Sequence, residues 1–560
     1  MTRSSFFKNL RDRAFSSRRV WLGLSLGLTA VYAVLAWQKA WGGDYVLADD
    51  GRQHLFWLAR YQDPELFRGD LIADYFEAVA PFGYRGLYWF GSLCGVAPFW
   101  LSKVMILPLY LLSVAWAFGV IWELFPVALA AGLGAIMFAQ SLGITDAIFS
   151  GTPKAFIYPL FTAFAYYLLR GSPVVVLVTG LLGLFYPQMM LVAMGVLLLR
   201  LWGWEKGRLR WRGDRWTVVS LLIGGGVLIP YVLGTHDFGP VVTKVEAQQM
   251  IEFSQAGRSR FFYDDAIRFW FEGRGGIRWA SILTPVTNGA GFGLLFLPWW
   301  RKRLPLLGKL RPKAIFLAQV VVASLGLFAI SHILLFRLHL PSRYTGHSLR
   351  LVMSLGAGIF LASLLDVLWP SQWKRLWQKG LGGMFTLVLL GGVLLYPLWI
   401  SGFPLTNYVS GHESELYEFL RSQPPNSLVA STSRIADDLP SFAQQPVLVA
   451  REYAIPYHLG YYEIFKTRVE DLISAQYSPD LEIVQEFCDR YQIDFWLLNH
   501  NAFEVAYLAE HGWLEDYQPV TQQALQRLKS GERPALASLV KTHTVLTGEN
   551  YWLLDMRSLR

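Results

Sequence analysis

Long apolar segments recur along the first 400 residues, and they constrain the fold more than any other feature of the sequence. The first runs from Trp21 to Trp41 and could cross the roughly 30 Å hydrocarbon core of a bilayer as one helix. It lacks a small-x-small cleavage site, so we interpret it as an uncleaved first helix and not as a signal peptide. Hydrophobic residues make up 53% of the chain and charged residues 16%, which excludes an ordinary soluble protein. The sequence predicts a polytopic α-helical membrane protein.

The apolar segments predict about eleven membrane helices. Two of them flank Tyr186 and Pro187 and are each too short to span alone, so we expect a hinged pair of short helices there. A further apolar segment, 86–100, is interrupted by Gly95 and Pro98, and we expect it to be re-entrant or interfacial. The predicted spans are residues 20–40, 102–124, 125–143, 154–170, 173–186, 187–202, 217–234, 280–300, 314–337, 346–369 and 382–402.

Clusters of Lys and Arg predict the orientation of these helices. They lie before the first helix and again from Arg200, Arg301 and Trp373, and loops of this kind stay in the cytoplasm. The N-terminus is then cytoplasmic, whereas the loops 41–101 and 235–279 and everything after the last helix are external. Because the basic residues are explained by these loops, the pI near 9.3 indicates no nucleic-acid partner.

The chain changes character after residue 402. Residues 403–560 contain 12 Lys and Arg against 21 Asp and Glu, and short β-type runs alternate there with helical patterns. We therefore expect two domains: a transmembrane domain, 1–402, and an external α/β domain, 403–560. The predicted strands are "NSLVAS", "QPVLVA", "DFWLLN" and "YWLLDM", and the predicted helices are Arg468–Gln476 and Asp480–Tyr491.

An acidic pair, Asp49 and Asp50 in "ADDGRQHLFW", follows the first helix on the predicted external side. The segment from this pair to Asp63 is expected to form an amphipathic helix along the membrane surface. Asp49 suits the N-cap of that helix, whereas the carboxylate of Asp50 is a candidate general base or metal ligand. His54 lies four residues on and could face Asp50, although a histidine on such a helix also serves as a simple polar contact.

Arg343, His347 and Arg350 are spaced by four and three residues where an external loop enters a membrane helix. On one helical face they could clamp a phosphate, for which the planar guanidinium is suited. An ionisable residue as deep as Arg350 needs a partner or an aqueous cavity. The alternative is that the two arginines reach up to lipid head groups.

Asp146 and Lys154 lie in another predicted external connection, "SLGITDAIFSGTPKAFIY". Asp146 is a candidate second acidic site residue and metal ligand, and Lys154 could meet a phosphate. Placement at helix ends explains each of them equally well. The loop 235–279 mixes aromatic and basic residues over a length that is unusual for an idle connection, and we expect it to form a flap over an external groove.

Together these features resemble the GT-C superfamily of integral-membrane glycosyltransferases. The resemblance lies in an acidic first external loop with an amphipathic segment, many further helices, short paired helices and a terminal α/β domain. The tail also resembles bacterial YfhO-type membrane proteins in "LYEFLRSQPPNSLVASTSRIADDLPSF" and "RYQIDFWLLN". The chain lacks the WWD-type motif of oligosaccharyltransferase catalytic subunits and the "HPDE" pattern of glycolipid-anchor mannosyltransferases, which leaves donor and acceptor open.

The resemblance implies sugar transfer, with inversion, from a polyprenyl-phosphate-linked donor to a lipid, glycan or protein acceptor at the external face of a bacterial plasma membrane. The acidic residue of the first external loop is the catalytic or metal-binding position in that superfamily, and it falls here on Asp50 or Asp49. Asp50 would take the proton of the acceptor hydroxyl, and Arg343, Arg350 and Lys154 would neutralise the phosphate.

Other possibilities remain open at this point. A divalent metal, Mg or Mn, could bind through Asp49, Asp50 and Asp146, since hard cations favour carboxylates. A lipid or solute transporter or flippase would also explain intramembrane arginine and broken helices. A non-catalytic membrane scaffold could instead use the external domain to hold a partner.

Overall fold

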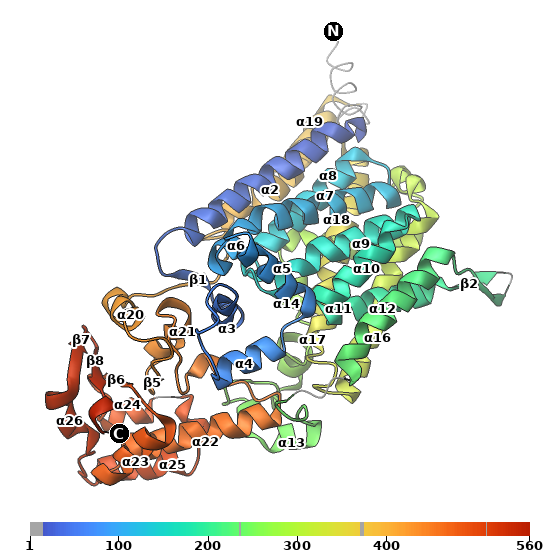
Figure 1. The fold of residues 1–560 in the computed structure, drawn as a ribbon. Coiled ribbons are helices and arrows are strands. Elements are labelled where there is room, and N and C mark those ends of the chain that lie inside the picture. The colour runs from blue at the N-terminus through green and yellow to red at the C-terminus, as the bar shows by residue number, and fades with distance from the viewer. Residues whose placement is uncertain (1–14, 206, 234–236, 370–374, 511, 560) are drawn as a thin grey trace.

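The computed structural model describes residues 15–205, 207–233, 237–369, 375–510 and 512–559. These residues form a helical bundle joined to a smaller C-terminal region that contains a four-stranded sheet (Figure 1). Within these described ranges, four helical segments are long and apolar enough to cross a membrane: Arg18–Ala40, Pro98–Leu124, Pro312–Ile333 and Ser342–Leu368. With the shorter apolar helices beside them they indicate a multi-pass integral membrane protein, while the total of about eleven crossings stays a prediction.

Helix α8 (Ala128–Gly143) forms the centre of the bundle, and all its residues are buried. It packs along α18 (Ser348–Leu368), the helix that carries Arg350. Gly134 and Gly358 allow the two backbones to touch, because a Cβ on Gly358 would lie 2.6 Å from the Cα of Gly134. Small residues are the usual means by which membrane helices approach closely.

Other helices surround this central pair, as Figure 1 shows. The two predicted short helices, α10 and α11, are present and meet at Tyr186 and Pro187. The surrounding helices are α2 (Arg18–Ala40), α7 (Ile106–Leu124), α9 (Ile157–Arg170), α10 (Val174–Phe185), α11 (Pro187–Arg200), α12 (Arg215–Leu233), α16 (Ile315–Ile333), α17 (Ser342–Gly346) and α19 (Leu376–Leu394). A hairpin of β2 (Trp202–Glu205) and β3 (Arg208–Trp211) follows α11.

Two apolar segments differ from a single regular helix. The segment predicted as the span 280–300 is divided into α14 (Trp279–Ile282), the 3-10 helix η6 (Val286–Phe296) and α15 (Leu297–Trp300). Proline and several glycines in this segment disfavour a continuous α-helix. The segment 86–100 falls within α5 (Phe82–Leu93) and α6 (Pro98–Val104), with the interruption at Gly95 and Pro98 as predicted.

The first loop is tied to the C-terminal region by a short antiparallel pair of strands. β1 (Val46–Ala48) pairs with β4 (Tyr408–Ser410) immediately before the acidic pair. The predicted continuous helix from Asp49 to Asp63 is instead α3 (Gly51–His54) followed by the 3-10 helix η1 (Phe56–Tyr61). Four consecutive apolar residues at this junction are all buried, which a single α-helical stripe does not achieve. The helix α4 (Leu71–Ala78) completes this part of the loop.

The C-terminal sheet has the strand order β5-β6-β8-β7. Three predicted strands contain β5 (Val429–Ala430), β6 (Phe495–Asn499) and β8 (Tyr551–Asp555), whereas "QPVLVA" contributes only a bridge from Val447 to Val429. The edge strand β7 (Thr544–Thr547) is a further strand. The helices of this region are α20 (Ser414–Arg421), α21 (Leu439–Phe442), α22 (Leu459–Gln476), α23 (Leu481–Tyr491), α24 (Val505–Ala509), α25 (Val520–Lys529) and α26 (Leu536–His543).

The described part of the loop 235–279 packs against the C-terminal region. The backbone N–H of Val242 donates to the carbonyl of Tyr457 at 2.9 Å. The backbone N–H of Leu459 donates to the carbonyl of Pro240 at 3.0 Å. The helix α13 (Lys244–Gln249) in this loop begins with a capping box between Thr243 and Glu246. The described part of the loop is therefore held against the region after residue 402 by backbone hydrogen bonds.

Candidate active site

Asp49 and Asp50 are positioned by the end of β1 and the start of α3. The backbone N–H of Asp49 donates to the carbonyl of Asn407 at 3.0 Å, which continues the pairing of β1 with β4. Asp50 occupies the N-cap position of α3, but its side chain accepts no capping hydrogen bond. The carboxylate of Asp49 binds Arg52 at 2.5 Å. The hypothesis that Asp49 caps the helix is thus wrong, because each carboxylate has a cationic partner instead.

The carboxylate of Asp50 forms an ion pair with Lys154. Lys154 lies on the 3-10 helix η3 (Pro153–Phe156), and its ammonium also binds Oδ2 of Asp146 at 2.5 Å. The three side chains come from two loops about 100 residues apart, so the fold brings together residues that the sequence suggested separately. The side chain of Lys154 is 12% exposed, whereas that of Asp50 is 39% exposed. Asp50 is therefore accessible to a ligand, whereas the ammonium of Lys154 that binds it is more deeply buried.

The charge of Lys154 determines the ionisation of Asp50. Desolvation is the largest single influence and raises the pKa of Asp50, but the charge and hydrogen bond of Lys154, with smaller contributions from His54 and Arg343, bring it down to about 2. Asp50 is consequently a carboxylate at neutral pH. As long as Lys154 stays bound, this carboxylate is a weak proton acceptor.

His54 lies beside Asp50 at the end of α3. Its ring packs edge-on against Phe76, with centroids 6.0 Å apart. Its Nδ1 is buried and has no hydrogen-bond partner among the residues that the structure describes. Desolvation lowers the pKa of His54 to about 4 in spite of the opposing charge of Asp50, so the ring is neutral at pH 7. At this pKa His54 is a poor proton acceptor at pH 7, and the predicted proximity to Asp50 is present.

Arg343 and His347 differ in how far they are already engaged. His347 Nδ1 is hydrogen-bonded to the hydroxyl of Tyr158 at 2.9 Å. Arg343, on α17, is half-buried and donates no side-chain hydrogen bond to any residue within the described ranges. Its charge nevertheless acts on both Asp50 and His54. A partly buried guanidinium with free donors next to a carboxylate is suited to binding an oxyanion.

Arg350 is engaged within the bundle. One nitrogen of its guanidinium donates to the carbonyl of Ser141 at 2.9 Å, and the other binds the hydroxyl of Ser281. The residue is 2% exposed, so it does not reach up to lipid head groups. These bonds join α18 to α8 and α14, and they leave Arg350 with fewer free donors than Arg343.

Arg278 is a cation of this cluster that sequence reasoning missed. It precedes α14 with a left-handed backbone, φ 62°. Desolvation lowers the pKa of Arg278, the neighbouring charges of Arg343 and Arg350 lower it further, and Asp146 opposes them. The segment "GRGGIR" was visible only as part of a long basic loop, because nothing local signals that Arg278 turns toward Arg343.

Arg52, two residues after Asp50, lies at the centre of a second charged cluster. It binds three carboxylates: Asp49 at 2.5 Å, Asp438 at 3.0 Å and Glu452 at 3.2 Å. Arg258 also binds Glu452, at 3.3 Å. Burial raises the pKa of Glu452 to about 7 although both arginines lower it. This Arg52 network joins the first loop, the second large loop and the C-terminal region, and most of it was not predicted.

The predicted metal ligands do not fit a divalent cation. Asp50 and Asp146 come together, but the cation between them is the ammonium of Lys154. Asp49 binds Arg52 instead. Within the described ranges there is no group of three or more His, Cys, Asp and Glu side chains that could hold a metal ion. Since Mg²⁺ and Mn²⁺ prefer several oxygen ligands, the Asp50 cluster is unsuited to either ion.

Comparison with known proteins identifies the fold. No family model and no curated protein sequence matches the chain. Among solved structures it is similar to the Archaeoglobus fulgidus oligosaccharyltransferase tethered to an acceptor peptide, with 10% identity and a TM-score of 0.50 over 90% of this chain and 72% of that one. It is also similar to the mycobacterial arabinofuranosyltransferase AftD, with 12% identity and a TM-score of 0.49, over 87% of this chain and 35% of that one.

The likeness to the archaeal oligosaccharyltransferase shows that this chain shares the fold of that protein. The resemblance drawn from the sequence is confirmed at this level. At 10% identity the comparison establishes a shared fold, and the reaction has to be inferred from the residues of the site.

Proposed function

We propose that the chain is a glycosyltransferase that moves a sugar from a polyprenyl-phosphate-linked donor to an acceptor hydroxyl or amide at the extracytoplasmic face. The observation that carries the proposal is the accessible carboxylate of Asp50, held by Lys154 and within electrostatic reach of the free guanidinium of Arg343. The proposed base and the proposed phosphate-binding cation are thus neighbours. The GT-C fold shared with an oligosaccharyltransferase supports it.

The proposed reaction is a single displacement. The acceptor atom attacks the anomeric carbon as its proton passes to the carboxylate of Asp50. The bond between that carbon and the phosphate oxygen breaks, and its electron pair leaves with the polyprenyl phosphate. Because attack and departure occur on opposite faces, the anomeric configuration inverts. Arg343 stabilises the charge that develops on the leaving phosphate.

The ion pair of Lys154 with Asp50 implies that the donor binds before Asp50 acts as a base. In the free protein it keeps the pKa of Asp50 near 2, which makes Asp50 a poor base. A phosphate bound between Lys154 and Arg343 would draw the ammonium away from Asp50. The pKa of Asp50 would then rise toward the value that its desolvation favours. Donor binding would thereby activate the base.

The C-terminal region is proposed to lie outside the membrane with the loops 41–101 and 235–279. Its sheet and α22–α26 stand apart from the helical bundle in Figure 1. Residues 403–560 carry an excess of acidic residues, unlike the basic segments proposed to face the cytoplasm. The region would cover the acceptor side of Asp50.

The test is a transfer assay with purified protein and a panel of hexosyl and pentosyl polyprenyl phosphates. We expect transfer from at least one donor, with inversion shown by NMR of the product. Arg343→Ala should raise the KM for the donor, and Arg68→Ala, on the exposed part of the first loop, should leave it unchanged. Absence of transfer from every donor, or retention of configuration, would contradict the proposal. Movement of the intact donor across liposomes without transfer would instead support a flippase.

A further inference from the structure

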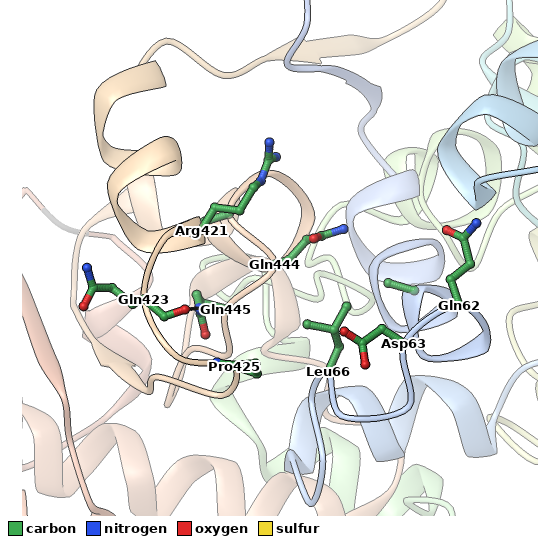
Figure 2. A pocket seen from close by; sticks show the side chains of 10 residues that line it. Gln62, Asp63, Leu66, Arg421, Gln423, Pro425, Gln444 and Gln445 are labelled. Atoms are coloured by element: carbon green, nitrogen blue, oxygen red, sulfur yellow. Dashed lines mark hydrogen bonds between the residues drawn. The ribbon is translucent and has the colours of Figure 1, made fainter.

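A cavity of about 340 Å³ lies between the first loop and the C-terminal region. Figure 2 shows Gln62, Asp63 and Leu66 of the first loop on one side, and Gln423, Pro425 and Gln444 on the other. Its size is at the lower end of the range for small-molecule sites in proteins. None of the residues proposed to act in sugar transfer lines it.

The walls of the cavity are held in place by hydrogen bonds between the two segments. The side chain of Asn426 accepts from the backbone N–H of Arg68 at 3.1 Å and donates to the carbonyl of Glu65 at 2.7 Å. Gln445, a buried residue of the lining, is fixed within the C-terminal region, because it accepts from the backbone N–H of Ser427 at 2.9 Å and donates to the carbonyl of Leu420 at 3.0 Å. The cavity is therefore formed before any ligand arrives, which lowers the entropic cost of binding.

Two amides in the lining have unused hydrogen-bonding capacity. The side chains of Gln62 and Gln444 bond to no other residue within the part of the chain that the structure describes. Gln444 is also held in a left-handed backbone conformation, φ 55°, which is uncommon for a residue with a Cβ and occurs often at functional positions. Asp63 adds a carboxylate that uses one oxygen for the backbone N–H of Glu65.

The chemistry of the lining favours a neutral, hydroxyl-rich ligand. Amides donate and accept hydrogen bonds, as hydroxyl groups do, and a carboxylate accepts from them. Arg421 is the cation of the lining, but it already donates to the carbonyl of Phe442 and lies over the ring of Tyr45. With Asp63 opposite, the cavity is unsuited to a phosphate. No aromatic residue is among its lining residues, so recognition of a ligand here would depend on hydrogen bonds.

We propose that this cavity is a glycan-binding subsite, separate from Asp50, that holds a neutral part of the acceptor or of the product. The choice of a glycan among hydroxyl-rich ligands rests on the proposed sugar transfer. The subsite is built jointly by the first loop, which carries Asp50, and by the C-terminal region. A glycan bound here would stay attached to the loop that carries the proposed base.

The test measures binding without catalysis. The full-length protein is placed in lipid nanodiscs, because maltoside detergents would themselves present sugars. Saturation-transfer NMR is recorded with neutral tri- and tetrasaccharides of glucose, mannose, galactose and arabinofuranose. We expect at least one series to bind, and Gln62→Met/Gln444→Met to bind it roughly tenfold more weakly through the loss of two neutral hydrogen bonds.

Matched variants separate this inference from the proposed function. Gln522→Met, at an exposed amide on α25, should bind like the wild type. Asp50→Asn should also bind like the wild type even though it lacks the proposed base. The subsite is overturned if no neutral oligosaccharide binds, if the double variant binds as well as the wild type, or if only a peptide competes for the cavity.

Discussion

The two charged clusters that meet at α3 contain similar residues but differ in exposure and in the number of their contacts. In the Asp50 cluster one ammonium, from Lys154, binds two carboxylates, and the carboxylate of Asp50 is 39% exposed. In the Arg52 network two arginines bind three carboxylates, and Arg52 is 11% exposed. The first cluster has room to exchange a partner, whereas the second is held by contacts from three segments.

The difference indicates which cluster can take part in a reaction and which one holds the first loop in place. A group that takes part in a reaction must change its partners, and Lys154 is held by only two carboxylates at the edge of an accessible site. A group that fixes a loop gains from several simultaneous contacts, as Arg52 does. Because Asp50 and Arg52 are two residues apart, the network around Arg52 sets the position of α3 on which Asp50 lies.

The largest effect is expected from Arg52→Met. Removing Arg52 leaves the carboxylate of Asp438 without its cationic partner and that of Glu452 with Arg258 alone, and breaking such a buried ion network costs about 3–5 kcal/mol of unfolding free energy. The control Arg68→Met breaks an exposed pair with Glu65 and should cost less than about 1 kcal/mol. Chemical denaturation in micelles measures both variants.

The pH dependence sharpens this prediction. Burial raises the pKa of Asp438 to about 6 and that of Glu452 to about 7, so both carboxyls are protonated at pH 5. With these two carboxyls neutral, fewer negative charges depend on Arg52, so Arg52→Met should cost less unfolding free energy at pH 5 than at pH 8. An equal cost at both values would show that Arg52 acts by packing alone.

Lys154→Met is expected to have a smaller effect, which is on the rate of sugar transfer. We expect the transfer rate to fall about 100-fold through loss of a preorganised charge. Without Lys154 the pKa of Asp50 rises from about 2. A base must be deprotonated, so the acid limb of the pH–rate profile should move to higher pH. Lys529→Met, at an exposed site on α25, is the control, and an unmoved acid limb in Lys154→Met would separate Lys154 from Asp50.

Glu452→Gln tests the network with a modest change. Glu452 has a pKa raised from 4.5 to about 7, so its folded state binds a proton more tightly than the unfolded chain. Its contribution to stability is therefore fully present below pH 4.5 and is lost as the pH rises through 7. The stability difference between Glu452→Gln and the wild type should grow in favour of the variant over this range, by up to about 3 kcal/mol. Glu463→Gln, at an exposed site, should show no such trend.

The smallest effect is expected from metal removal. Lys154 already occupies the position between Asp50 and Asp146. Treatment with a chelator should leave the transfer rate unchanged within about twofold, a difference of less than 0.5 kcal/mol. Loss of activity that Mg²⁺ or Mn²⁺ restores would contradict this assignment of the Asp50 cluster.

The sequence predicted what depends on neighbours along the chain. Apolar runs located the helices, and the hinge at Tyr186 and Pro187 followed from length and proline chemistry. The expected helix from Asp49 to Asp63 failed because tertiary burial of consecutive apolar residues outweighed the local pattern. "QPVLVA" failed as a strand because a hydrophobic run alone does not supply a paired neighbour.

The candidate site was predicted as separate residues and not as an arrangement. Asp50, Asp146 and Lys154 each stood out as charges beside apolar helices, but their shared ion pairs depend on the packing of distant loops. Arg52 binds residues nearly 400 positions away, and no local sequence pattern predicts such a contact. Arg343 and Arg350 looked equivalent by spacing, and only the structure distinguishes the free guanidinium from the engaged one.

The most direct test of the account compares the transfer rates of Asp50→Asn and Asp49→Asn. The two substitutions make the same chemical change at adjacent positions, one in each charged cluster. If Asp50 is the base, Asp50→Asn should lower the rate at saturating donor by at least about 100-fold. Asp49, which is 47% exposed, should be replaceable with a loss of no more than a few-fold. Asp50→Asn retaining the wild-type rate would contradict the central claim.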